Sequence, residues 1–156
     1  MKVFIMRHGE AEMLAASDKA RHLTEYGRQQ VYSQAEWLKS VLTQPEHIIV
    51  SPYTRAIETF EQIDVVFSRR LSDRVEVWDG ITPYGNSEIV SDYLATLAEK
   101  DPKLQILIVS HLPLVGKIVA ELCGKNSVDF YPATIAQVEW DTEHGHVEKI
   151  KFVGKE

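Results

Sequence analysis

The stretch Lys2-Val3-Phe4-Ile5-Met6 (KVFIM) runs directly into Arg7-His8-Gly9-Glu10 (RHGE). A short continuous apolar run that contains β-branched and aromatic residues is typical of a strand buried on both faces. Two potential cations directly after such a strand must be paired or face a ligand, because an isolated buried charge is costly. The stretch therefore predicts a buried strand that ends in a polar, functional tip.

Short apolar runs alternate with longer amphipathic segments along the rest of the chain. This alternation predicts an α/β fold, a three-layer sandwich with a mostly parallel central sheet. The run at 105–110 (QILIVS) is the most hydrophobic, so we expect it at the centre of the sheet. The last two strands flank a turn at 143–145 and are expected as antiparallel edge strands near the C-terminus. Strands are predicted at 2–6, 47–51, 74–78, 105–110, 133–140 and 146–153, and helices at 27–42, 52–67, 87–100 and 112–122.

Length and composition restrict the class of protein. The 156 residues fit a single domain spanning 1–156, and 44% hydrophobic with 26% charged residues is a normal globular balance. A formal net charge of -6 argues against nucleic acid as a partner. The single cysteine, Cys123, excludes an intramolecular disulfide, and we find no apolar run long enough for a signal-peptide core or a membrane span. We therefore expect a cytoplasmic protein with no membrane partner.

Three predicted strands deliver an arginine or a histidine to the same edge of the sheet. Arg7 and His8 follow the first strand, Arg55 lies just after the second, and His111 follows QILIVS. Ligands of open α/β sheets bind outside the carboxyl ends of the strands. Arginine is the planar, permanently charged donor for phosphate oxygens, and Gly9 allows close backbone approach. The cluster is typical of a phosphoryl-binding site.

These residues also resemble a known family. Arg7-His8-Gly9 is similar to the RHG signature of the histidine phosphatase superfamily, residues 51–59 (SPYTRAIET) to its S-P-x-x-R-A-x-E-T motif, and Ser110-His111 to its third motif. The resemblance implies a phosphoglycerate-mutase-like fold. It also implies that His8 is the nucleophile and carries a transient phosphate, while Arg7, Arg55 and His111 hold the phosphoryl oxygens. No metal and no organic cofactor is implied.

Within that superfamily the chain resembles the small SixA type of phosphohistidine phosphatase. The similarity rests on chain length and on residues 21–27 (RHLTEYG) and 81–85 (ITPYG). Only one helix, a short strand and another helix are expected between Arg55 and His111, which leaves no large lid subdomain. By this resemblance the substrate is a phosphohistidine on a protein, such as a phosphorylated histidine phosphotransfer (HPt) domain of a phosphorelay. Arg21 is then a further phosphate contact, or else a solvated loop cation.

The sequence does not select a general acid. A phosphoramidate bond leaves easily as imidazole, so a strong acid matters less than for an alkyl phosphate. Four carboxylates remain candidates for the acid, namely Glu10, Glu12, Asp18 and Asp79. Glu58 is not among them: it lies three residues after Arg55 on a predicted helix and is expected to orient that arginine.

Three other functions remain open. The same centre could serve a small-molecule phosphomonoesterase, or the chain could be a catalytically silent phosphate-binding protein. A zinc site built from His8, His22 and His111 is a further alternative, although the chain contains no C-x-x-C or H-E-x-x-H spacing.

Overall fold

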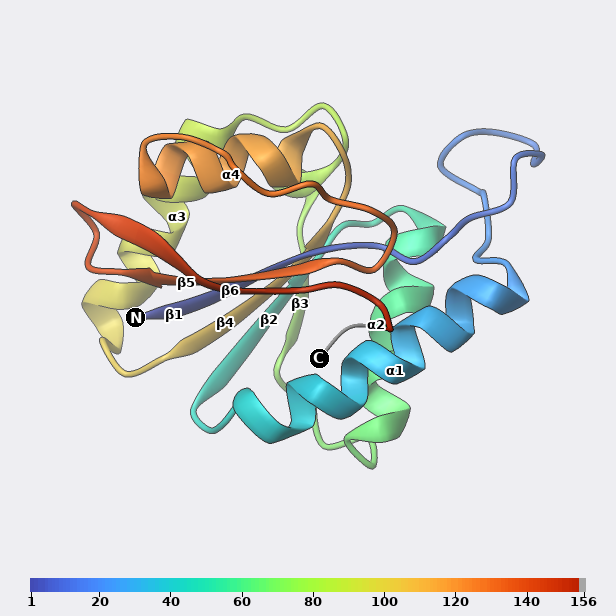
Figure 1. Ribbon diagram of the computed structural model, residues 1–156, viewed down its shortest axis with the longest axis horizontal. Coiled ribbons are helices and arrows are strands. Elements are labelled where there is room, and N and C mark those ends of the chain that lie inside the picture. Colours follow the sequence, from blue (N-terminus) through green and yellow to red (C-terminus); the bar gives the residue numbers. More distant parts are fainter. Residues whose placement is uncertain (155–156) are drawn as a thin grey trace.

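Six strands form one sheet in the order β3-β2-β4-β1-β5-β6 in the computed structural model, which describes residues 1–154 (Figure 1). The pairs β1·β4, β2·β4 and β2·β3 are parallel, whereas β5 is antiparallel to both β1 and β6. The QILIVS strand, β4, lies inside the sheet as predicted, and the last two strands form the antiparallel edge. The strands are β1 (Lys2–Arg7), β2 (Glu46–Val50), β3 (Val75–Val77), β4 (Gln105–Ser110), β5 (Ile135–Trp140) and β6 (Gly145–Lys151).

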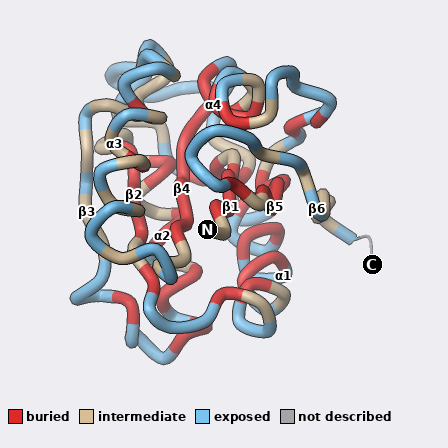
Figure 2. Tube along the Cα trace, turned by 90° about the vertical axis from the view of Figure 1, so that its left-hand side faces the viewer, coloured by how far each residue is buried: buried red, intermediate tan, exposed pale blue. Residues whose placement is uncertain are grey.

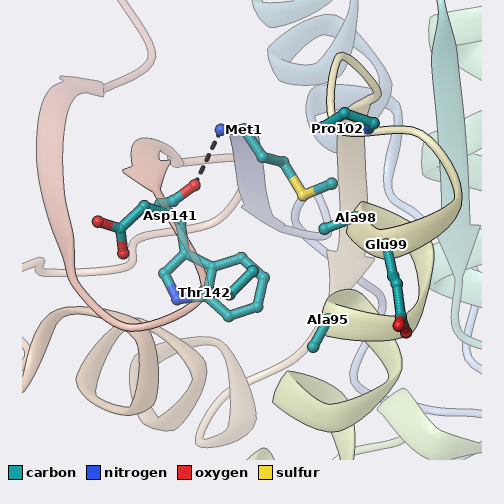
Figure 3. A pocket seen from close by; sticks show the side chains of 8 residues that line it. Met1, Ala95, Ala98, Glu99, Pro102, Asp141 and Thr142 are labelled. Carbon is teal, nitrogen blue, oxygen red and sulfur yellow. Dashed lines mark hydrogen bonds between the residues drawn. The ribbon is translucent and has the colours of Figure 1, made fainter.

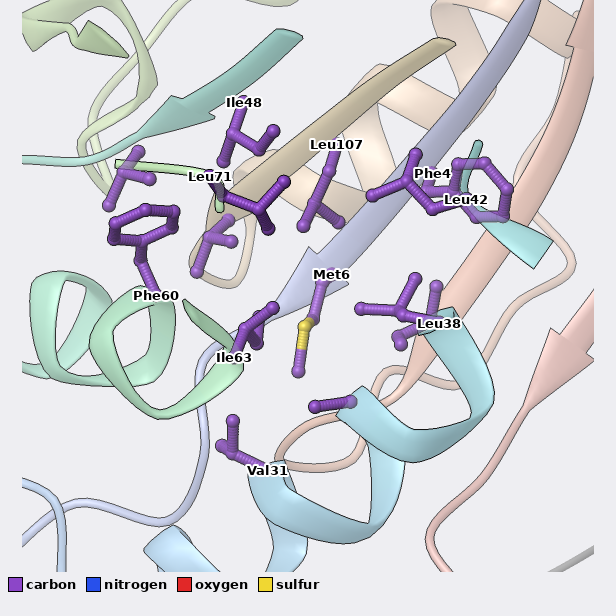
Figure 4. Close-up of a cluster of buried hydrophobic side chains, with 14 of the residues drawn as sticks. Phe4, Met6, Val31, Leu38, Leu42, Ile48, Phe60, Ile63, Leu71 and Leu107 are labelled. Carbon is purple, nitrogen blue, oxygen red and sulfur yellow. The ribbon is translucent and has the colours of Figure 1, made fainter. Parts of the chain in front are cut away.

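Two helices cover each face of this sheet. Successive side chains of a strand point to opposite faces, so β1 contributes Phe4 and Met6 to one core and Val3 and Ile5 to the other. Figure 4 shows the first core, under α1 and α2. Figure 2 shows the central strands buried between exposed outer surfaces, which confirms the three-layer sandwich. The helices are α1 (Glu25–Val41), α2 (Thr54–Val66), α3 (Ser87–Lys100) and α4 (Leu114–Cys123), with a 3₁₀ turn η1 (Asp79–Ile81).

Helix boundaries follow local capping. Thr24 precedes α1 and its hydroxyl accepts a hydrogen bond from the Gly27 amide at 2.9 Å. The prediction that α4 begins at Leu112 was wrong, because Pro113 is the N-cap residue and Leu112 is 44% exposed. This places Leu112 at the surface beside the end of β4.

The connection from α2 to β4 contains only β3, η1 and α3, so no large lid subdomain is present. Within residues 1–154, no helix combines the length and apolar character that a bilayer crossing requires.

Candidate active site

The parallel strands bring His8, Arg55 and His111 together at their carboxyl ends. Arg7 pairs with Ser110 in the β1·β4 register, so His8 and His111 leave the sheet side by side. Their ring centroids are 5.1 Å apart. Arg55, in the first turn of α2, reaches His8 with its Nε 3.2 Å from His8 Nε2. The convergence that the strand order predicts is therefore present.

The hydrogen bonds of His8 leave one of its ring nitrogens unprotonated. Its Nδ1 lies 2.7 Å from the Gly9 carbonyl oxygen, which can only accept, so Nδ1 carries the proton. Nε2 is then unprotonated and accepts from Arg55 Nε–H. Burial lowers the pKa of His8 to about 3, aided by the charges of Arg55, Arg7 and Arg21 and opposed by the Gly9 hydrogen bond. The neutral, nucleophilic form is thus the stable form at physiological pH.

Asp18 links two arginines of the site. Its Oδ2 lies 3.3 Å from Arg55 Nη2 and its Oδ1 lies 3.1 Å from Arg21 Nη1, while its backbone oxygen accepts from Arg55 Nη1 at 2.8 Å. Burial acts to raise the pKa of Asp18, but its bonds to Arg21 and Arg55 outweigh burial and lower the pKa. Of the four candidate acids, Asp18 is the one that contacts Arg55, and it is held as a carboxylate.

Arg7 and His111 each present an unsatisfied nitrogen. Arg7 Nη1 donates to the Phe130 carbonyl at 2.9 Å, and His111 Nε2 shares a hydrogen bond with Ser51 Oγ at 2.7 Å. Arg7 Nε and His111 Nδ1 are buried and have no hydrogen-bond partner within residues 1–154. Buried polar atoms are normally satisfied, so these two nitrogens have hydrogen-bonding capacity that the contacts within the chain leave unused.

The electrostatics at His111 match those at His8. Burial lowers the pKa of His111 to about 2, with further lowering from His8 and Arg55. Burial and the neighbouring Arg55 charge also lower the pKa of Arg7. Burial and the neighbouring charges therefore disfavour protonation of His8 and His111, while the arginine charges favour the binding of an anion.

The prediction that Glu58 orients Arg55 was wrong. Glu58 instead accepts from the Leu23 amide at 2.8 Å and contacts His22 and Arg28, which ties α2 to the start of α1. The residue that fixes the Arg55 backbone is Thr59, one full turn later. Its hydroxyl donates to the Arg55 carbonyl at 2.7 Å.

Sequence reasoning therefore missed Thr59 and Ser51 as positioning residues. Thr59 Oγ1 also accepts from the Gly9 amide at 3.2 Å, which joins the exit of β1 to α2. Ser51 accepts from the Tyr53 amide at 3.2 Å and holds His111. Both are lettered positions of the S-P-x-x-R-A-x-E-T motif, and that was the signal that could have found them.

Gly9 lies where a side chain does not fit. A Cβ at Gly9 would be 2.8 Å from the Gly27 carbonyl oxygen and 2.9 Å from Val31 Cγ2. Its amide is taken by Thr59 and its carbonyl by His8. Its role in substrate binding stays a prediction, and its observed contacts position the His8 ring and join β1 to α2. Arg21 is near the site through Asp18, with its Nε donating to the Glu12 carbonyl at 2.6 Å.

The three histidines of the alternative zinc site are not equivalent. His8 and His111 are buried together, whereas His22 is exposed and its Nδ1 lies 2.8 Å from Glu58. Among residues 1–154, no group of three His, Cys, Asp or Glu side chains is placed to hold a metal ion.

A separate cavity of about 380 Å³ lies at the other end of the sheet (Figure 3). Apolar groups from Met1, Trp140, Ala95, Ala98 and Pro102 line much of it, together with Glu99, Asp141 and Thr142. It lies beside the amino end of β1, whereas the cationic cluster lies at the carboxyl end. The cavity therefore belongs to a different part of the molecule.

Comparison with known proteins agrees with this geometry. Residues 3–84 match the model of the histidine phosphatase superfamily (branch 1). The chain belongs to the histidine phosphatase superfamily. The family resemblance predicted from the three motifs is therefore confirmed, and so is the resemblance to the SixA type predicted from chain length and from residues 21–27 and 81–85.

Relatives of this histidine phosphatase cover nearly all of the chain. A phosphohistidine phosphatase SixA homolog of Haemophilus influenzae is 56% identical over 147 residues, which is 90% of this chain and 89% of the relative. Phosphohistidine phosphatase SixA of Escherichia coli is 42% identical over 142 residues, 90% and 86% of the two chains. A solved structure of the protein histidine phosphatase SixA complexed with tungstate superposes with a TM-score of 0.90 at 39% identity, covering 97% of both chains.

Proposed function

We propose that this chain hydrolyses phosphohistidine on a protein through a phospho-His8 intermediate. The observation that carries the proposal is the unprotonated His8 Nε2, 3.2 Å from Arg55 Nε inside a buried cationic cluster. The relatives named phosphohistidine phosphatase supply the reaction class. A neutral imidazole among arginines is suited to attack phosphorus rather than to bind a cation.

In the first step, the His8 Nε2 lone pair forms a bond to phosphorus and the P–N bond of the substrate breaks. The reacting form of the substrate carries a proton on its other ring nitrogen, so the leaving group keeps the electron pair of the broken P–N bond and departs as neutral imidazole. In the second step, water attacks the phosphorus of phospho-His8, the new P–N bond breaks with its electron pair returning to His8 Nε2, and the water protons leave with inorganic phosphate as dihydrogen phosphate, while Nδ1 keeps its proton. Arg7, Arg55 and His111 hold the equatorial oxygens, where charge develops.

Arg55 links the two steps. In the free protein its Nε–H donates to the nucleophilic nitrogen, which fixes the ring for in-line attack. When Nε2 bonds to phosphorus, its lone pair no longer accepts the Arg55 Nε–H, which can then donate to an oxygen of the same phosphoryl group. Thr59, through the Arg55 carbonyl, keeps the arginine in reach during this exchange.

The ionised state of Asp18 favours phosphohistidine over a phosphate ester. An alkyl ester needs an acid to protonate its leaving oxygen, but the arginines hold Asp18 as a carboxylate. The lack of a large lid also favours a phosphate displayed on a protein, and we propose an HPt domain of a cytoplasmic phosphorelay as the partner. A small-molecule phosphomonoesterase is the alternative that the same test addresses.

The test is release of phosphate from a phosphorylated HPt domain, with an aryl phosphate ester assayed alongside. Wild type should release phosphate from the HPt domain much faster than from the ester. His8→Asn should be inactive on both substrates, whereas His146→Ala, which changes an exposed histidine of β6, should match wild type.

A quench in alkaline detergent adds a direct readout of the intermediate, because a phosphohistidine survives in base and is hydrolysed in acid. Wild type mixed with radiolabelled phosphohistidine substrate should carry an acid-labile, base-stable label that His8→Asn lacks. Fast ester turnover with an untouched HPt domain would move the protein to the small-molecule alternative. Phosphate binding without any turnover would establish the silent binder instead.

A further inference from the structure

Large apolar side chains gather at the catalytic end of this molecule. Within residues 1–154, ten large hydrophobic side chains are exposed, and five of them lie outside the helices and strands, on the connections that follow β1, β3 and β4 and precede β5. We call these five the apolar rim; they are Met13, Leu14, Tyr84, Leu112 and Tyr131. Single exposed apolar residues are ordinary, but a group around a functional site marks an interaction surface.

Three members of the apolar rim lie on three different connections. Leu112 directly follows His111, and Tyr131 lies two residues before Ala133, whose amide donates to the His8 carbonyl at 2.9 Å. Tyr84 precedes Gly85, which packs against Leu114 at the start of α4. The rim therefore has a fixed place relative to the nucleophile on this side of the site.

The remaining two members stand on the connection between β1 and α1, which projects from the body in Figure 1. Met13 shares a cavity of about 270 Å³ with Asp18 and Arg21. The same connection reaches α2, where the Lys19 carbonyl accepts from the Thr54 amide at 3.0 Å. Met13 and Leu14 are nonetheless 85% and 87% exposed, so they pack on little of this chain.

The charge around the rim is acidic, although the site beneath it is cationic. In the connections 8–24, 78–86, 111–113 and 124–134 the exposed acidic and lysine side chains comprise four carboxylates and two lysines. The carboxylates are Glu12, Asp18, Asp79 and Asp129, and the lysines are Lys19 and Lys125. Such a surface repels a bare phosphate and attracts a phosphate that cations surround.

We propose that the apolar rim and its carboxylates dock one kind of partner: a protein whose phosphohistidine is flanked by apolar and basic side chains. This proposal rests on the proposed phosphohistidine phosphatase function. His8 is only 7% exposed, and a histidine side chain is short, so transfer requires the partner's backbone to approach the rim closely. Apolar contact with the rim and ion pairs at its edge then select the substrate before the chemistry begins.

The test compares free phosphohistidine with a phosphorylated HPt domain prepared in two forms. One form carries lysines, and the other glutamates, at the positions three and four residues from the phosphohistidine. We expect wild type to act on the lysine form with a kcat/KM at least about tenfold higher at low salt, and the ratio should shrink at high salt because surface charges are screened. Glu12→Lys with Asp79→Lys should reverse the preference.

The apolar contribution is tested separately. Met13→Ser with Leu14→Ser should raise KM for the lysine form at least about fivefold, with turnover of free phosphohistidine unchanged. Tyr32→Ser, which alters an exposed tyrosine of α1 outside the rim, should leave both substrates at wild-type rates. The charge-reversed variant, the Met13 and Leu14 variant and the Tyr32 variant all change exposed side chains. Thermal unfolding should show that all three remain folded.

The outcomes separate the docking surface from the chemistry. Equal rates on both HPt forms, a preference for the glutamate form, or rim variants that behave like Tyr32→Ser would overturn the docking proposal while His8-dependent turnover of free phosphohistidine continues. Loss of turnover on every phosphohistidine substrate, with wild type equal to His8→Asn, would instead overturn the proposed function and the docking proposal with it.

Discussion

Acidification from pH 8 to pH 5 should destabilise this protein strongly through two buried histidines. Burial lowers the pKa of His8 to about 3 and that of His111 to about 2, from an ordinary value of 6.5. Below pH 6.5 the unfolded chain therefore takes up two protons that the folded chain does not. The free energy of unfolding falls as pH falls through this window, and the loss continues toward the folded-state values.

The magnitude follows from proton linkage. Each histidine contributes about 1.4 kcal/mol per pH unit inside the window, so between pH 6.5 and pH 5 each costs about 2 kcal/mol. Together they cost about 4 kcal/mol, which is a large part of the stability of a typical domain, about 5–15 kcal/mol. Ordinary carboxyl groups titrate near about pH 4 and contribute little over this range.

Urea unfolding at pH 8, 6.5 and 5 measures the effect, in buffers without phosphate because an anion that binds the folded site would mask it. His8→Gln and His111→Gln should each remove about half of the pH dependence, since glutamine does not titrate. His146→Gln, at an exposed position, should behave like wild type. A pH dependence in both buried variants equal to that of wild type would refute the assignment of the effect to these imidazoles.

Three further substitutions test the contacts around the site. Asp18→Asn removes the negative charge that pairs with Arg55 and Arg21. Two unit charges about 4 Å apart interact by about 1 kcal/mol in a water-like dielectric, so calorimetry should show inorganic phosphate binding about fivefold more tightly; unchanged or weaker affinity would contradict this. Thr59→Val leaves the buried Gly9 amide without its acceptor and should lower the free energy of unfolding by about 1–3 kcal/mol in urea titrations, whereas a neutral effect would show that the amide finds another partner. Gly9→Ala drives a Cβ against the Gly27 carbonyl and Val31 and should cost about 1–3 kcal/mol, with a reduced unfolding midpoint; an unchanged midpoint would mean that β1 and α1 separate freely.

The arrangement of strands and helices was predictable because the period of the apolar residues changes from one element to the next. On β1, Phe4 and Met6 point to one face of the sheet and Val3 and Ile5 to the other. Because both faces carry apolar side chains, both must be covered by helices. The start of α4 was not predictable from apolar spacing. Leu112 continues the spacing of the helix, but it comes before the proline that begins the first turn.

The central site residues were predictable because each follows a recognisable strand, whereas their supporting contacts were not. Glu58 has suitable helical spacing from Arg55, yet spacing cannot show that the Leu23 amide competes for its carboxylate. Asp18 could not be selected among four carboxylates, because the irregular connection that holds it has no period to read. Only the folded chain shows that its carboxylate lies between Arg21 and Arg55.

The strand order has a consequence for how this scaffold tolerates change. His8, Arg55 and His111 follow β1, β2 and β4, which are adjacent in the interior of the sheet, whereas β3 and β6 form its two borders. Lengthening, trimming or decorating a border strand leaves the spacing among the three interior strands intact. The borders are therefore where an engineer could graft a binding module or a sensor onto this protein and leave the spacing of His8, Arg55 and His111 undisturbed.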